Sequence, residues 1–130
     1  MSEVDEHFRR GVELFNRGDF FEAHEEMEEA MNLLEDESAD WDFFLGLLRA
    51  AVAHHKLSQQ QTRSAILHLG AALKFLTPFP DRHRGLKLRE FRSALSAQLA
   101  RLQARADDAA ESAPPRLEFD AVRSRSGPHQ

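Results

Sequence analysis

The chain has 130 residues, a length that suits one domain with a core of its own, and its 17 Lys and Arg against 22 Asp and Glu give a formal net charge of −5. It contains no Cys, which excludes disulfides, thiolate catalysis and zinc sites built from Cys. The charged N-terminal sequence MSEVDEHFRRG lacks the apolar segment of a secretory signal, and no apolar run approaches the ~20 residues of a membrane span. We therefore expect a soluble, cytoplasmic protein with no membrane partner.

The first two helices are short and amphipathic. Apolar residues at helical spacing predict one helix over residues 5–16 and a second over residues 20–34. Gly18 is expected to close the first helix in the left-handed conformation, and Asp19 to cap the second. The inward stripe of the second helix contains one unexpected polar residue, His24.

The run FFLGLLRAAVA, residues 43–53, is the feature around which the fold is expected to form. Ten of its eleven residues are apolar or Gly, and a helix that is apolar on every side has to be surrounded by others. We predict a central helix over residues 41–57 that begins at Asp40 as its cap. The apolar residues expected to be shielded from water include Leu45, Leu48 and Val52.

One charge, Arg49, interrupts this central run. A buried charge without a partner is strongly destabilising, so Arg49 is expected to pair with an acid. The second helix, rich in glutamates, is the nearest source.

Two further helices are predicted, over residues 62–76 and 86–103, with the sequence TPFP breaking the chain between them. Gly70 lies inside the fourth helix, where Gly costs about 1 kcal/mol relative to Ala. We expect another backbone to pass close to it.

Composition divides the chain into a helical domain, residues 1–105, and a tail, residues 106–130, that is rich in Ala, Asp, Ser, Pro and Arg and is expected to be disordered. A short docking motif in this tail, built from Leu117, Phe119 and Val122, is the alternative. Residues 1–42 hold 15 acids against 3 bases and residues 43–130 hold 7 against 14. The two halves are therefore expected to pack against each other, with a two-sided surface for a charged partner as the alternative.

The predicted fold class is all-α: a compact bundle of about five helices around a central buried helix. The sequence LFNRGDFFEA, residues 14–23, is similar to the corner of a tetratricopeptide hairpin. Residues 48–76 contain a second pair of predicted helices, joined by a polar turn. No third copy is found, and about three stacked repeats are normally needed for an open array. A closed bundle of tetratricopeptide-like hairpins is therefore favoured.

Three stretches together resemble a known family. LFNRGDFFEAHEEMEEAM, FLGLLRAAVAHHK and SAILHLGAALKFL are similar to the small, all-helical, uncharacterised family called domain of unknown function 309. The resemblance covers roughly residues 8–99, and its most specific part is Glu-Ala-His-Glu, residues 22–25. It departs from the family pattern at Met31, at Arg49 and at Gln60-Gln61. It implies a helical fold and no established activity.

Polar residues of the second and third helices form the candidate site. His24 and Glu28 lie one turn apart on the same face, and the third helix supplies a guanidinium and two imidazoles. Because adjacent residues of a helix point about 100° apart, at most one of the two imidazoles can join a given site, and the other is expected at the surface. The candidate residues are Glu22, His24, Glu25, Glu28, Arg49, His54 and His55.

Three uses of this cluster are conceivable. His and Glu from two helices would suit Zn or Fe, and a Glu beside a His would suit acid-base catalysis. In the third, a glutamate pairs with Arg49 and the cluster is structural. We favour the structural use, because no HExxH or paired ExxH motif is present, and we assign no metal and no cofactor.

The favoured function is a non-enzymatic binding or scaffold module that uses a groove beside the second and third helices. The alternative is a metal-dependent enzyme that uses His24, Glu25, Glu28 and either His54 or His55. The expected partner is a protein or a small molecule, or a second copy of the chain. Nucleic-acid binding is disfavoured, because basic and aromatic residues do not alternate along the basic stretch at residues 82–92 and the whole chain is acidic.

Overall fold

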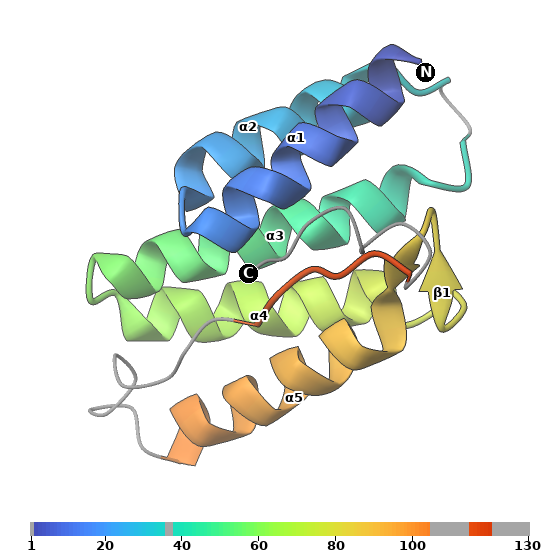
Figure 1. Cartoon of the computed structure of the whole chain (residues 1–130). Coiled ribbons are helices and arrows are strands. Elements are labelled where there is room, and N and C mark those ends of the chain that lie inside the picture. Colours follow the sequence, from blue (N-terminus) through green and yellow to red (C-terminus); the bar gives the residue numbers. More distant parts are fainter. Residues whose placement is uncertain (1, 36–37, 105–114, 121–130) are drawn as a thin grey trace.

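Five helices and one small hairpin make up the computed structural model, which describes residues 2–35, 38–104 and 115–120 (Figure 1). The elements in chain order are α1 Glu3–Arg17, α2 Phe20–Asn32, α3 Trp41–Ser58, α4 Thr62–Leu76, β1 Arg82–His83, β2 Leu86–Lys87 and α5 Leu88–Ala104. The predicted all-α class is confirmed. No helix of the described ranges is long and apolar enough to cross a bilayer.

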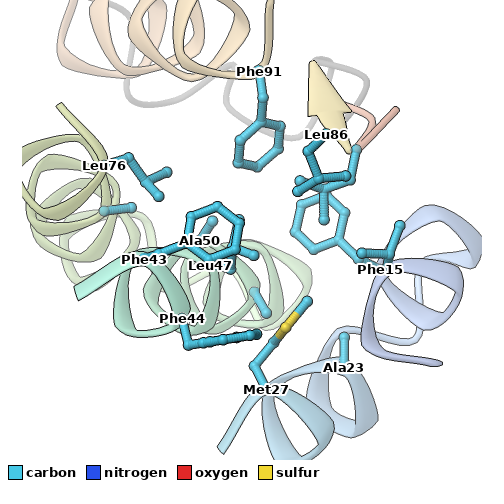
Figure 2. Close-up of a cluster of buried hydrophobic side chains, with 14 of the residues drawn as sticks. Phe15, Ala23, Met27, Phe43, Phe44, Leu47, Ala50, Leu76, Leu86 and Phe91 are labelled. Carbon is cyan, nitrogen blue, oxygen red and sulfur yellow. The ribbon is translucent and has the colours of Figure 1, made fainter. Parts of the chain in front are cut away.

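The central position predicted for α3 is confirmed (Figure 1). Helix α3 packs against α2 on one side and α4 on the other, while α1 pairs with α2 and α5 with α4. Phe43, Phe44, Leu47 and Ala50 of α3 are fully buried, and they meet Phe15 and Met27 of the first two helices together with Leu86 and Phe91 (Figure 2).

The shielding predicted for one side of α3 is incomplete. Leu45, Leu48 and Val52 are only half-buried, although Leu45 and Leu48 pack against the core. These three residues recur at intervals of three and four, so they share one side of the helix. Since α2 and α4 flank α3, this side remains in partial contact with water.

The turn between α1 and α2 forms at Gly18, as predicted. Gly18 has a φ of 88°, and its N–H donates to the carbonyls of Leu14 and Phe15. Asp19 occupies the N-cap position of α2, but its carboxylate makes no capping bond and instead accepts from Nε of Arg17 at 3.3 Å.

Glycines in the two central helices have opposite surroundings. A Cβ added at Gly46 of α3 would lie 2.6 Å from Cγ of Leu76, so Gly46 allows α3 and α4 to approach closely. A Cβ added at Gly70 would meet nothing within 4 Å. The expected close approach at Gly70 is therefore wrong.

The β1–β2 hairpin was not predicted from the sequence, which indicated a helix from Leu86. Its strands pair antiparallel, with Arg82 opposite Lys87. The turn residues Arg84 and Gly85 have φ angles of 50° and 82°, the two left-handed conformations of a tight hairpin. Helix α5 consequently begins two residues later, at Leu88.

Residues 115–120 pack onto the domain, so the disorder expected of the tail does not extend to them. Leu117 is 2 % exposed and belongs to the core, and Phe119 forms a β-bridge with Leu86. Val122, the third residue of the alternative docking motif, lies outside the described residues.

Candidate functional site

His54 is a core residue. It is 3 % exposed, and its ring lies against Phe15 and Phe20. Burial lowers the pKa of His54 despite the hydrogen bonds to Ala50 and Gln98, so the ring is neutral near pH 7.

Because the ring of His54 is neutral, one of its nitrogens donates a hydrogen bond and the other accepts one. Nδ1 donates to the carbonyl of Ala50 at 2.7 Å, which leaves Nε2 as an acceptor facing the side-chain amide of Gln98, whose Oε1 lies 3.0 Å away. The amide NH₂ of Gln98, which is buried and otherwise without a partner, satisfies this acceptor when it is turned toward the ring. His54 is thus fully engaged in internal bonds.

His24 and His55 are partly exposed, and the rings of both lie beside that of Phe21. The ring of Phe21 is 5.4 Å from that of His24 and 5.5 Å from that of His55, between ring centroids. Nδ1 of His24 is also 3.1 Å from the carbonyl of Phe21. Phe21 is nevertheless 48 % exposed. We call Phe21, His24 and His55 the Phe21 patch.

Arg49 points toward α4, so the carboxylate partner predicted for it from α2 is wrong. Its Nη1 lies 3.1 Å from Nδ1 of His68, and none of the ion pairs within the described residues involves Arg49. Arg49 is half-buried, so water solvates part of the guanidinium and no acid is required. Burial and the charges of Arg49 and Lys56 lower the pKa of His68, which therefore accepts from Arg49 as a neutral ring.

The glutamates of α2 lie on different sides of the helix. Glu22, Glu25 and Glu28 are exposed, whereas Glu26, which was not predicted, faces α1 and lies 2.6 Å from Nδ1 of His7. Within the described part of the chain, no three His, Asp or Glu side chains are grouped as metal ligands. Of the candidate residues, His24 and His55 both lie beside Phe21, whereas His54 is in the core and Arg49 contacts His68.

A polar network that the sequence did not indicate lies at the other end of α3. The carboxylate of Asp40 is 2.8 Å from Nε2 of His83 and accepts from Nε of Arg84 at 2.6 Å, and Arg84 also donates to Asp5 at 3.1 Å. Burial acts to raise the pKa of Asp40, but the bonds from Arg84 and His83 outweigh it and hold the pKa below its usual value.

These residues, Asp5, Asp40, His83 and Arg84, form what we call the Asp40 network. It joins the acidic N-terminal half of the chain to the basic C-terminal half, as the division of charge predicted. Asp40 was expected only to cap α3, yet its side chain makes no capping bond. The one available signal was the sequence His-Arg-Gly, whose Gly permits the turn that brings both cations to Asp40.

One surface combines exposed apolar and charged groups. Leu45, Leu48 and Val52 form a half-buried stripe along α3, and His55 follows Val52 at the same helical spacing. Because the ring of His55 lies beside that of Phe21, the Phe21 patch lies at the end of this stripe. We call this stripe and the patch together the α3 face. On α3, Arg49 and Lys56 follow on the side of α4, and α2 contributes the exposed carboxylates of Glu25 and Glu28.

Two comparisons with known proteins support the resemblance in the sequence. Residues 8–67 match the model of a family described as a domain of unknown function, DUF309. The chain is also 35 % identical over 85 residues to an uncharacterised protein of Aquifex aeolicus (strain VF5). That match covers 65 % of this chain and 25 % of the Aquifex protein, so the chain spans about a quarter of the length of this relative.

Proposed function

We propose that the domain, whose residues 8–67 match the model of the domain of unknown function 309 family, is a non-enzymatic interaction module. The α3 face is its binding surface, and the partner is an amphipathic helix of another protein. The observation that carries the proposal is the exposed ring of Phe21, 48 % accessible and flanked by two imidazoles.

An exposed aromatic ring beside half-buried aliphatic residues is suited to anchor a partner. Aromatic side chains bury a large apolar area for few rotatable bonds, and they are enriched among residues that dominate binding energy. Phe21 offers such a ring, and Leu48 and Val52 extend the apolar contact along α3.

Charge on the two sides of the stripe selects the partner. The α2 side carries Glu25 and Glu28, and the α4 side carries Arg49 and Lys56. A complementary helix has an apolar stripe with basic residues along one edge and acidic residues along the other. Such pairing fixes orientation more than affinity, because exposed ion pairs contribute little.

The dispersion of the polar residues also favours binding over catalysis. His54 is occupied by Ala50 and Gln98 in the core, and Arg49 by His68. Of the other candidates, His24 and His55 lie beside Phe21, and Glu22, Glu25 and Glu28 are exposed. The length of the Aquifex relative fits a module as well, since the matching residues are a quarter of a longer protein.

Affinity capture with three forms of the chain tests this function. The wild type, Phe21→Ser and Leu67→Ser are used as baits in a lysate of the source cells. Leu67 of α4 is 71 % exposed and serves as a matched control for removing an exposed apolar side chain. We expect a partner that the wild type and Leu67→Ser retain and that Phe21→Ser loses by at least tenfold.

A partner captured equally by all three baits would contradict the proposal. A second, untagged copy of this chain counts as a partner in the same assay and has to meet the same requirement for Phe21.

A further inference from the structure

Residues 115–120 form an extended segment that runs from the middle of the bundle to the hairpin (Figure 1, red). This surface is distinct from the α3 face. The segment contributes Leu117 to the core, where it is 2 % exposed, while Glu118 between the two apolar residues is exposed. Its sequence Leu-Glu-Phe-Asp, residues 117–120, thus alternates inward and outward as a strand does.

The backbone of the segment is recognised at both ends. The side-chain amide of Asn16 pairs with Leu117 twice: Nδ2 donates to the carbonyl of Leu117 at 2.8 Å, and the N–H of Leu117 donates to Oδ1 at 2.9 Å. Farther along, the N–H of Lys87 donates to the carbonyl of Glu118 at 2.6 Å, and the N–H of Asp120 donates to the carbonyl of Gly85 at 2.6 Å. The segment therefore pairs with β2 through one antiparallel β-bridge, between Phe119 and Leu86.

The side chains of the segment meet complementary groups. The ring of Phe119 lies 6.0 Å from that of Phe8 in an edge-on arrangement, with the guanidinium of Arg9 at 5.7 Å. The outward acids meet cations of the hairpin, where Glu118 lies 3.7 Å from Nζ of Lys87 and Asp120 accepts from Arg82. In recognition by strand addition, main-chain hydrogen bonds give affinity and pockets for alternate side chains give specificity. Both are present here, and the ion pairs of Glu118 and Asp120 add to them.

We propose that α1 and the hairpin form a peptide-binding site for an extended Leu-acid-Phe-acid segment, which this chain fills with its own residues 117–120 and which a partner peptide of the same pattern enters in trans. Asn16 and Leu117 are 101 positions apart, so the contacts are those that a separate peptide would make. Phe8, Arg9 and Asn16 lie within the family match at residues 8–67, whereas the segment lies outside it. The α1 part of the site therefore lies in the region that matches the family model, whereas the segment that fills the site lies outside that region.

A full-length variant that cannot fill its own site provides the test. Leu117→Ala together with Phe119→Ala removes both inward side chains of the segment and leaves the receptor residues intact. A fluorescent peptide of residues 115–120 is added, and its anisotropy is measured. The tethered segment competes at a high effective concentration in the wild type. We therefore expect the peptide to bind the double variant at least tenfold more tightly than the wild type.

Three controls make this result specific. Arg116→Ala alters an exposed residue of the segment and should keep the site closed, as in the wild type. A peptide with Ala in place of Leu and Phe should not bind. Adding Asn16→Ala to the double variant should weaken binding of the peptide at least fivefold. Adding Asn32→Ala, at an exposed position of α2, should leave binding of the peptide unchanged.

If the double variant fails to fold, the folded full-length chain with a protease site inserted between residues 109 and 110 replaces it. After cleavage, we expect the released tail to stay bound in gel filtration or the labelled peptide to take its place. Loss of the tail with no peptide binding at 1 mM would overturn the proposal. Binding that is equal for the Ala-substituted peptide would overturn it as well.

Discussion

His54 and His55 are adjacent in sequence, yet one is buried in the core and the other lies on the surface. Successive residues of a helix point about 100° apart, so only one of such a pair can face a given neighbour. Phe15 and Phe20 enclose His54, and Phe21 covers part of His55. The two imidazoles therefore act separately, one in packing and one at the proposed binding surface.

Protonation of the Asp40 carboxylate should lower the stability of the fold. Its pKa is held below the usual value in the folded chain, so it stabilises the fold above the pKa of the unfolded chain, about 3.9, and this contribution is lost as the pH falls through the folded pKa. We predict that Asp40→Asn lowers the free energy of unfolding by about 2 kcal/mol at pH 7, because hydrogen bonds to charged groups are weakened.

Urea unfolding between pH 7 and pH 3 measures this effect. The difference between wild type and Asp40→Asn should shrink below about pH 4, where the carboxylate is protonated. Asp42→Asn, an exposed carboxylate in the first turn of α3, is the control and should change stability by less than about 0.5 kcal/mol. A difference at Asp40 that does not depend on pH would contradict this role.

At the scale of elements, α3 and α4 pack closely at Gly46. Substitution by Ala should have opposite effects on stability at Gly46 and at Gly70. Gly46→Ala would place Cβ 2.6 Å from Leu76, so we predict a loss of about 1–3 kcal/mol. Gly70→Ala meets no atom within 4 Å and should stabilise α4 by up to about 1 kcal/mol. Thermal unfolding of both variants checks the pair, and the same direction of change at both glycines would be inconsistent with the packing.

The helices were predictable because each carries a long apolar repeat. The hairpin and the segment at residues 115–120 carry no such repeat. Two residues in each strand are too few to display an alternating pattern. The turn Arg84-Gly85 does not have the Asn-Gly or Asp-Gly sequence that signals a hairpin, and Arg84 adopts a positive φ that is uncommon for Arg. The segment at residues 115–120 is similarly short, and its order depends on partners more than thirty positions away, such as Asn16 and Leu86.

At the scale of the whole molecule, sequence periodicity predicted the bundle and its central helix but not the partners of the polar side chains. Arg49 illustrates the difference. Its place in an apolar run indicated burial and an acid partner, yet one side of α3 is left half-exposed and the guanidinium meets His68. Periodicity identifies which side of a helix is apolar, whereas the direction of a long charged side chain depends on tertiary contacts. The tetratricopeptide-like character of the hairpins stays a prediction.

Two surfaces of the molecule are suited to partners in different ways. The α3 face presents an apolar stripe with opposite charges at its edges, and the α1–hairpin surface presents backbone groups and an Asn clamp. They involve different elements, so Phe21→Ser should leave the peptide site unchanged.

Contact between the α3 face and a partner helix is tested most directly by a photoreactive phenylalanine analogue at position 21, with the same analogue at the exposed position 67 as the control. After irradiation in cells, mass spectrometry identifies the cross-linked peptides. We predict that position 21 links to one amphipathic helix with basic and acidic edges, and that position 67 does not. Equal linkage at the two positions, or none at position 21, would contradict the proposed binding surface.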